Sequence, residues 1–528
     1  MLNTEEIRQA FAYEGRISRR LLLSYTGALA ALPNLGLASA RAFSPVFTKD
    51  PFSLGVASGD PDSQGVVLWT RLAPEPLQPF GGMPNEPVSV HWEISEKENM
   101  SAVVQQGTEI ATPQLGHSVH VEVDGLKADR WYWYRFRCGD AESRIGRTRT
   151  CPASEVDKLT FAVTSCQNYE QGLFTAYERM QQDNPDLVVH LGDYIYEYRA
   201  GRTGKVREHY GEEIQSLNDY RARHAQYKSE PLLQAMHAQC PWLVTWDDHE
   251  FDNNCANEIS EEGDVAVADF LVRRANAYQA YYEMMPLRRS SMPRGASMQL
   301  FRKVSYGNLA DFLVLDTRQY RTDQPNNDRR SPLNFSAKHP DNSLLGRQQK
   351  NWLCGELIAS DAQWNILAQQ VMMGTVGTKS KDSDELLYSM DQWPGAVAER
   401  NQLLSYIRDR RVSNPVVLTG DIHSNWANEL RADDLMDDQP VVASEFVCTS
   451  LSSGGNGSDK PDHYDELLAN NQCIKFHNRQ RGYILCTVDQ EKWQSDYVVV
   501  DQVLKPGGNC SIRKSLIVES GDPRINDA

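Results

Sequence analysis

Four apolar runs in the second part of the chain each stop at residues that can bind a metal ion. The runs end at Cys166, at Asp193 with Tyr196 three residues on, at Asp247-Asp248-His249-Glu250, and at Asp421 with His423 two residues on. Turns that leave the carboxyl ends of strands in an α/β sheet project side chains into one crevice, so the four endings should meet. A single Gly-Asp after a strand is often only a helix cap or turn. Four such endings bearing Cys, Asp, Tyr and His favour a polynuclear metal centre.

The same part of the chain alternates short apolar runs with longer amphipathic stretches, which predicts a layered α/β domain. The predicted strands are 159–164, 186–191, 242–246, 312–315, 364–371 and 416–419, and the predicted helices are 173–182, 217–236, 264–285 and 346–360. Strand-like alternation returns at 482–500 and completes the sheet. We therefore place a catalytic domain with C-terminal strands at 158–510. The polar run 452–460 (SSGGNGSDK) is typical of a flexible loop.

Residues 47–152 have a different pattern, with the period of two that half-buried strands show. Val88, Val90 and Trp92 alternate with polar neighbours, and the connecting segments are rich in turn residues. This predicts an N-terminal antiparallel β-sandwich without catalytic residues. Residues 126–134 (LKADRWYWY) resemble the tyrosine-bearing corner of fibronectin-type modules.

The first 40 residues have the order of features of an export signal. Arg19 and Arg20 precede a modest apolar run at 21–32, and Ala38-Ser39-Ala40 offers a cleavage site. The paired arginines resemble a twin-arginine signal, so we expect export by the twin-arginine machinery to the periplasm or the cell exterior. The alternative is an amphipathic N-terminal helix that stays attached. No uninterrupted apolar run reaches the roughly 20 residues of a membrane-spanning helix.

Charge and cysteine content narrow the function classes further. The chain has 71 acidic and 54 basic side chains, a net charge of −17, so its surface as a whole repels nucleic acids and anionic membranes. A phosphate-bearing substrate must be attracted locally, and bound cations would do this. None of the ten cysteines forms a CxxC pair, which argues against a zinc knuckle, while Cys138 and Cys151 could form a disulfide.

The order GDxxY, DDHE and GDxH along the chain resembles the metallophosphoesterase superfamily, whose usual motifs are GDxxY, GNHE and GHxH. Three departures are informative: Asp248 replaces Asn, Asp421 replaces the first His of GHxH, and Cys166 replaces the Asp of the first motif. With these departures, the chain resembles PhoD-type alkaline phosphatases over almost its whole length. The stretches that carry the resemblance are 52–74, 165–180, 190–198, 246–254, 315–321, 419–426 and 476–483.

The resemblance implies an N-terminal β-sandwich followed by a four-layer αββα metallophosphoesterase domain that binds one ferric ion and calcium. By similarity, Cys166, Asp193, Tyr196 and His423 are assigned to Fe3+, and Asp193, Asp248 and Asp421 to Ca2+. Thiolate, phenolate and imidazole suit a ferric ion, whereas oxygen-only ligands suit a hard cation. Asn254 is a candidate for a further calcium shell, although an Asn in an acidic turn is commonly structural.

The expected function is an exported alkaline phosphatase that hydrolyses phosphomonoesters and phosphodiesters through a metal-bound hydroxide or oxide. His249 resembles the GNHE histidine, which contacts phosphate or assists the leaving group; its alternative is a capping or core-edge histidine. Two other functions stay open. One is a phospholipase-D-like or teichoic-acid-directed phosphodiesterase, and the other is a catalytically inactive surface-binding protein. His190 and His463 are expected to be structural, and the sequence does not place Trp393, Arg318 or Arg481 at the substrate.

Overall fold

The computed structural model describes residues 45–436 and 438–528, so the predicted export signal at 1–40 lies outside the described residues. Within them the largest sheet, here called the large sheet, has the strand order β24-β23-β22-β21-β9-β10-β11-β1-β2-β5. Its strands are β1 (Val56–Gly59), β2 (Val66–Arg71), β5 (Ser118–Val123), β9 (Lys158–Thr164), β10 (Leu187–His190), β11 (Trp242–Val244), β21 (Arg481–Asp489), β22 (Lys492–Val500), β23 (Cys510–Glu519) and β24 (Asp522–Asp527).

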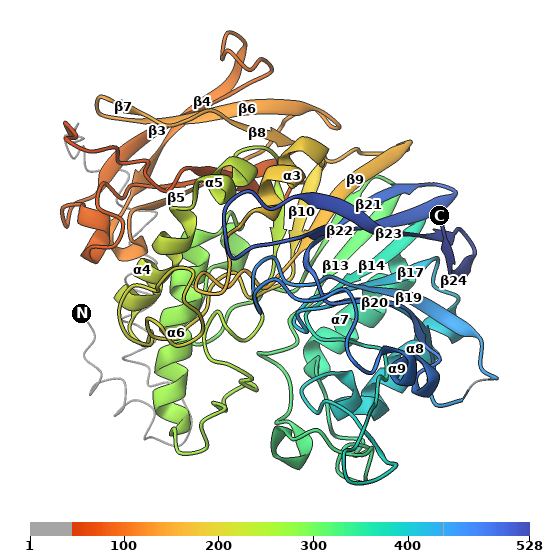
Figure 1. The fold of residues 1–528 in the computed structure, drawn as a ribbon. Helices are drawn as coiled ribbons and strands as arrows, with labels where there is room; N and C mark the ends of the chain where they lie inside the picture. Colours follow the sequence, from red (N-terminus) through yellow and green to blue (C-terminus); the bar gives the residue numbers. More distant parts are fainter. Residues whose placement is uncertain (1–44, 437) are drawn as a thin grey trace.

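A second sheet has the order β12-β13-β14-β17-β19-β18-β20, and β15 and β16 form a hairpin (Figure 1). These strands are β12 (Arg302–Tyr306), β13 (Ala310–Val314), β14 (Trp364–Ala368), β15 (Thr378–Lys379), β16 (Leu386–Leu387), β17 (Pro415–Thr419), β18 (Asn425–Arg431), β19 (Val441–Val447) and β20 (Ile474–Asn478). The helices are α3 (Ala176–Asp183), α4 (Leu217–Lys228), α5 (Pro231–His237), α6 (Val267–Met284), α7 (Gly346–Ala359), α8 (Val397–Arg410) and α9 (Tyr464–Asn470). Short 3-10 turns are η2 (Pro79–Gly82), η3 (Pro113–Leu115), η4 (Arg289–Ser291), η5 (Pro325–Asp328) and η6 (Trp393–Ala396).

The large sheet and the second sheet pack face to face, because their inner side chains belong to one apolar core. Phe161 of β9 contacts Phe312 of β13 edge-to-face, with ring centroids 5.2 Å apart. The neighbouring residue Ala162 points to the opposite face, where the core includes residues of α3, α4 and α6. The outer face of the second sheet packs against α7 and α8. Central strands are thus buried on both faces, which is why they appear in the sequence as continuous apolar runs rather than alternating ones.

The N-terminal strands are divided between two sheets, so the predicted domains at 47–152 and 158–510 share the large sheet. A smaller N-terminal sheet contains β3 (Val88–Ser95), β4 (Val103–Ala111), β6 (Trp131–Cys138), β7 (Ala141–Glu142) and β8 (Gly146–Arg149), and it lies at the top of Figure 1. Its apolar face packs on β1, β2 and β5, which are themselves strands of the large sheet. At the other edge, β23 and β24 extend that sheet beyond residue 510.

One predicted helix is two in the structure. The stretch 217–236 forms α4 and α5, which are separated at Ser229 and Glu230 because Pro231 has no N–H for a continuous helix. Pro231 instead occupies the first turn of α5, where a missing N–H costs nothing. The strands and the other helices occur near their predicted positions.

Strand direction brings the ends of both sheets to one place. β9, β10 and β11 are mutually parallel in the large sheet, and β13, β14 and β17 are parallel in the second sheet. The loops that follow their carboxyl ends carry the candidate ligands.

All ten cysteines, which lie in the described part of the chain, are free, so Cys138 and Cys151 do not form the disulfide considered above. None of the described helices has the length and apolar character needed to cross a membrane.

Candidate metal centre

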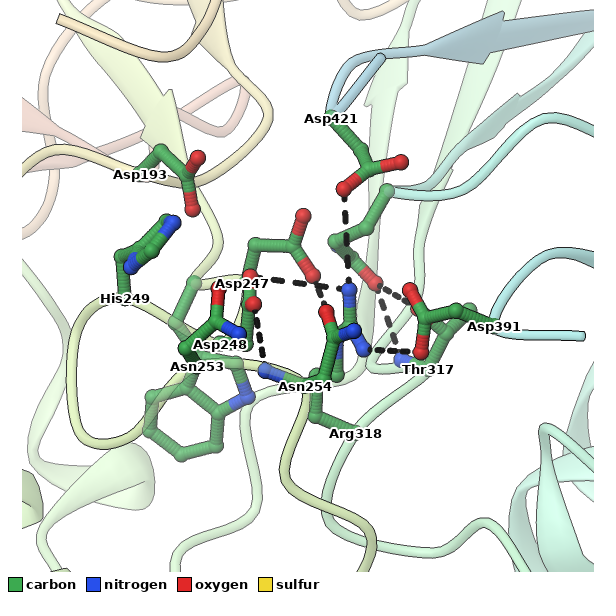
Figure 2. A network of polar contacts seen from close by, with 12 residues as sticks. Asp193, Asp247, Asp248, His249, Asn253, Asn254, Thr317, Arg318, Asp391 and Asp421 are labelled. Atoms are coloured by element: carbon green, nitrogen blue, oxygen red, sulfur yellow. Dashed lines mark hydrogen bonds and ion pairs between the residues drawn. The ribbon is translucent and has the colours of Figure 1, made fainter. Parts of the chain in front are cut away.

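The structure brings all six candidate ligands and His249 to the edge where the two sheets meet. Except for the Tyr196 oxygen, their ligand atoms form, together with Asp247, three overlapping groups, each with all atoms within 4.8 Å of one another: Cys166, Asp193 and His423; Asp193, Asp248 and His249; and Asp247, Asp248 and Asp421. Figure 2 shows Asp193 and His249 on one side and Asp421, Asp391 and Arg318 on the other, with Asp247 and Asp248 between them. Asp193 and Asp248 each belong to two groups, so the site has the form of a chain of adjoining cation positions.

Several candidate ligands have a left-handed backbone at the ends of their strands. The φ angles are 56° at Cys166, 56° at Asp193, 61° at Asp421 and 53° at His423. Side-chain-bearing residues rarely adopt this conformation, which costs on the order of 1–3 kcal/mol where the residue is not Gly. Here it turns the chain sharply after β9, β10 and β17, so that successive side chains point across the strand ends instead of continuing the sheet.

Around Tyr196 the structure forms a compact group of sulfur, oxygen and nitrogen ligands. The Tyr196 hydroxyl donates to Asp193 Oδ2 at 2.8 Å and lies 3.2 Å from His423 Nε2. Ser453 Oγ is 2.7 Å from the Tyr196 oxygen and also donates to the backbone carbonyl of Cys166 at 2.7 Å. Ser453 therefore connects the Cys166 turn to the Tyr196 side chain.

The protonation states of Cys166, Tyr196 and Asp193 make this group suited to bind a highly charged cation. Burial and the adjacent Asp193 raise the pKa of both Cys166 and Tyr196 well above the ordinary values, so the protein alone keeps both protonated. Burial acts on Asp193 in the same direction, but His249, His423 and Tyr196 outweigh it and lower the pKa of this carboxyl. Asp193 Oδ1 is buried without a hydrogen-bond partner among the described residues. An ionised Asp193 with a free buried oxygen is suited to bind a cation that displaces the two neighbouring protons.

The acidic end of the site contains more carboxylates than its guanidinium groups can balance. Arg318 bonds to Asp247, and its Nη1 donates to Asp391 at 2.7 Å. Its Nη2 lies 3.5 Å from Asp248 Oδ1 and 3.7 Å from Asp421 Oδ1, outside good hydrogen-bond range. Asp391 also pairs with Arg321, whose Nη1 lies 2.9 Å from Asp391 Oδ1, so two guanidinium groups face four carboxylates.

The pKa shifts of these carboxyl groups show the same shortage of positive charge. Burial raises the pKa of Asp247 and of Asp248, although Arg318 opposes the shift. Burial and the nearby Asp391 raise the pKa of Asp421 to about 7. Asp248 Oδ1 and Asp247 Oδ2 are buried with no hydrogen-bond partner among the described residues. Oxygen-only groups of this kind fit a hard divalent cation, which would supply the missing charge.

His249 is held by a buried carboxylate. Its Nδ1 lies 2.8 Å from Glu197 Oε2, and the other oxygen of Glu197 accepts the Asn253 N–H at 3.2 Å. Burial alone would lower the pKa of His249, but Glu197, Asp193 and Asp248 raise it well above its usual range. The bond at Nδ1 leaves Nε2 free for the site, so His249 can donate a proton there while it remains positively charged.

Four further residues of the site were missed by sequence reasoning: Glu197, Asp247, Asp391 and Ser453. Two had a signal, because Asp247 belongs to the acidic run after β11 and Glu197 directly follows Tyr196. Asp391 follows no apolar run, and only folding brings it to Arg318. Ser453 lies in the segment 452–460 that was interpreted as flexible. Its complete burial corrects that interpretation at this position.

The structure also places the residues to which sequence analysis assigned no definite role in the site. Arg481 donates to the carbonyls of His423 and Ser453, and so supports the site from behind. Trp393 is buried and donates to Gln369 instead of facing the ligands. His190 is buried in β10 against Trp242, and His463 lies on the surface. Asn254 donates its backbone N–H to Asp248 Oδ2 at 2.7 Å.

Comparisons with known proteins agree with this architecture. A family model described as PhoD-like phosphatase matches residues 161–497, and one described as PhoD-like phosphatase, N-terminal domain, matches residues 37–152. The chain is 47% identical over 530 residues to alkaline phosphatase D of Bacillus subtilis (strain 168), covering 98% of this chain and 90% of the relative. A solved structure described as PhoD matches with a TM-score of 0.89 and 48% identity, covering 92% of this chain and 93% of that chain. This chain therefore belongs to the PhoD-like phosphatase family.

Proposed function

We propose that this protein is a metal-dependent alkaline phosphatase that hydrolyses phosphomonoesters and phosphodiesters. The observation that carries the proposal is the chain of three adjoining ligand groups, whose carboxylates exceed the positive charge that the protein provides. Such a site attracts cations first and, through them, phosphate oxygens. The name of the Bacillus subtilis relative, alkaline phosphatase D, supports the same activity.

The residues divide into two cation positions by their chemistry. Cys166, Asp193 and His423, with Tyr196 beside them, would hold a ferric ion. Asp193, Asp248 and Asp421 would hold calcium, although Asp193 and Asp248 belong to one ligand group and Asp248 and Asp421 to the next. When bound, these cations would polarise the phosphoryl oxygens, activate the attacking water and stabilise the leaving oxygen. The buried, unpartnered oxygens of Asp193 and Asp248 support this division.

His249 would act on the substrate directly, while Glu197 would act through His249. Glu197 fixes the ring so that Nε2 faces the space beside Asp193 and Asp248. A protonated Nε2 can donate a hydrogen bond to a phosphoryl oxygen or a proton to the departing oxygen. The ring is confined between Tyr196 and Tyr198, with centroid distances of 4.1 and 5.4 Å, so its orientation is restricted before substrate binds.

The finer features of the fold and the location in the cell are proposals as well. A fibronectin-like N-terminal sandwich is supported by the bond from the Lys127 N–H to the Tyr132 hydroxyl oxygen, 2.9 Å long. The packing of helices outside two facing sheets supports an αββα catalytic domain. Export by the twin-arginine machinery to the periplasm or exterior rests on Arg19 and Arg20.

The proposal can be tested on protein purified without chelators. We expect hydrolysis of both p-nitrophenyl phosphate and bis(p-nitrophenyl) phosphate, with the metal content measured on the same sample. Asp421→Asn should lower kcat by about 100-fold or more, because it removes ligand charge. Asp341→Asn, on an exposed residue, serves as the control. Metal-replete protein that binds phosphate esters without turnover would favour an inactive binding protein, and activity confined to diesters would favour a dedicated phosphodiesterase.

The two metals can be tested separately. Ferric iron bound to thiolate and phenolate should give a visible absorption band, and Tyr196→Phe should shift or bleach it. Removal of calcium by a chelator that leaves iron in place should abolish most activity, and added calcium should restore it. Iron-free, colourless and fully active protein would refute the iron position, and full recovery with zinc alone would refute the calcium position.

A further inference from the structure

A short basic segment lies next to the site in this acidic protein. Residues 199–207 contain four cationic side chains in a chain whose net charge is −17. Arg207 already has partners within the protein, because it pairs with Glu230 at 2.6 Å and donates to the backbone carbonyl of Tyr169. The other three, Arg199, Arg202 and Lys205, are exposed, and no carboxylate of the described residues forms an ion pair with them. These three residues are called the basic rim below.

Ring contacts connect the basic rim to the catalytic histidine. The Arg202 guanidinium lies over the ring of Tyr198, 5.9 Å from its centroid. The Tyr198 ring meets the His249 ring edge-on, with centroids 5.4 Å apart. Arg202 is therefore separated from His249 by one aromatic ring. Arg199 is close to Arg202 along the chain, because the Arg202 N–H donates to the Arg199 carbonyl in a turn.

The backbone of this segment is fixed before any ligand binds. The buried carboxylate of Glu170 accepts N–H groups from Gly201 at 2.6 Å, Thr203 at 2.9 Å and His209 at 2.9 Å. Arg223 donates to the carbonyl of Tyr198 at 2.9 Å. On a fixed backbone, a cationic side chain that binds an anion loses its own rotamer freedom but no backbone entropy.

We propose that Arg202, with Arg199 and Lys205 beside it, binds a second phosphate group of the substrate, distinct from the phosphate that reacts. The proposal rests on the proposed phosphatase function, since the reacting phosphate is placed at the metal centre. A substrate that extends from His249 across Tyr198 presents its next anionic group to the Arg202 guanidinium. The planar guanidinium group can direct two parallel N–H groups at two phosphate oxygens, a bidentate geometry that an ammonium group does not offer.

The test compares substrates that differ by one phosphate: glucose 1,6-bisphosphate against glucose 1-phosphate and glucose 6-phosphate. We expect kcat/KM for the bisphosphate to exceed that of each monophosphate by about five- to tenfold, mainly through a lower KM. Arg202→Ala should lower this ratio toward one, whereas Arg202→Lys should retain part of the wild-type preference for the bisphosphate. Because the contact is exposed, added salt should lower the ratio in wild-type protein.

Lys158→Ala is the matched control. It removes an exposed positive charge at the start of β9, whereas the site lies beyond the other end of that strand, so the ratio should not change. A wild-type ratio near one, or an unchanged ratio in Arg202→Ala and in the triple alanine variant of the rim, would overturn the proposal. If wild-type protein hydrolyses none of the three compounds, p-nitrophenyl phosphate decides whether the phosphatase proposal fails as well. Binding measured by calorimetry then tests the role of the basic rim. A preference for the bisphosphate that Arg202→Ala abolishes supports the proposal, and equal binding of the three compounds overturns it.

Discussion

Single residues in strained conformations give the candidate metal centre its geometry. Cys166, Asp193 and Asp421 leave three different strands with φ angles near +60°, and each turn directs a ligand atom toward the others. The cost of such backbones is tolerated only where the surrounding structure determines them. Here β9 and β10 continue to pair beyond their ends, because the Cys166 N–H donates to the Gly192 carbonyl at 3.1 Å.

Gly192 is a residue at which an added methyl group should disturb the metal centre. Its φ is +112°, and a Cβ atom would lie 2.5 Å from the Asp247 Cβ and 2.5 Å from the Asp247 nitrogen. Gly192→Ala should therefore displace Asp247, lower the bound-metal content, and reduce the free energy of unfolding by about 1–3 kcal/mol. Gly507→Ala is the control, because Gly507 also has a positive φ but no atom within 4 Å. Equal metal content in the two variants would contradict this explanation.

Lys228 should make the protein more stable as the pH rises. Its buried ammonium lies 4.3 Å from the centre of the Trp69 ring, and burial lowers its pKa from 10.5 to about 7. Below pH 7 both the folded and the unfolded chain carry this proton. Between pH 7 and 10.5 the unfolded chain binds more protons at this residue, so stability increases with pH.

Lys228→Met should remove this gain. Wild-type protein should gain about 3 kcal/mol from this residue between pH 7 and pH 9.5, and the variant should lack that part of the increase in denaturant titrations. Lys158→Met, at an exposed position, should retain the wild-type dependence. Parallel pH profiles for wild type and Lys228→Met would show that Lys228 is not a neutral buried amine above pH 7.

At the scale of structural elements, the segment after β10 depends on one carboxylate. The loop 199–209 contains no helix or strand, yet four of its N–H groups converge on Glu170. The loop also follows directly after Tyr196 and Tyr198, which confine His249. A well-ordered loop therefore helps to keep Tyr196, Tyr198 and His249 in place.

Glu170→Gln should loosen this loop. The amide group retains only one acceptor oxygen, so some of the converging N–H groups lose a charged partner, at a cost of about 1–3 kcal/mol. We expect faster hydrogen exchange at 199–209 and new tryptic cleavage at Arg199, Arg202 or Lys205. Glu178→Gln, on the exposed face of α3, is the control. Unchanged exchange in the loop would show that Glu170 does not hold it.

At the scale of the whole molecule, the large sheet connects the N-terminal strands with the catalytic core. β1 pairs in parallel with β11, the strand that leads to Asp247 and Asp248. The same β1 pairs with β2, whose side chains form the core beneath the N-terminal sheet. The two parts recognised by separate family models thus share one sheet, and we expect them to unfold together.

Leu68→Ala tests this cooperativity. Leu68 is fully buried in β2, so its truncation should cost about 2–5 kcal/mol. The whole calorimetric unfolding transition should move to lower temperature. When β2 is lost, β1 loses a pairing partner, and β1 in turn supports β11. A separate early transition, with the catalytic part unchanged, would instead show two independent folding units.

Much of the site could be predicted because its ligands stand at strand ends. A strand buried on both faces must be apolar throughout, so the first polar residue after it marks the edge of the sheet. Cys166, Asp193 and Asp421 were found in this way. Asp391 could not be found, because it lies in a loop and its partner Arg318 is 73 positions away. Its function as a partner of Arg318 depends on how the second sheet packs.

The sequence by itself determined the order of the elements, the residues at their ends and the family to which the chain belongs. These features are local, because periodicity and motif spacing are properties of neighbouring residues. Only the tertiary structure decided that β1, β2 and β5 join the large sheet, that Glu197 orients His249, and that Ser453 is buried against Tyr196. The alternation of a strand is the same whichever strand it pairs with, and a hydrogen bond between distant residues leaves no local pattern. The partners are fixed by the packing of the two sheets.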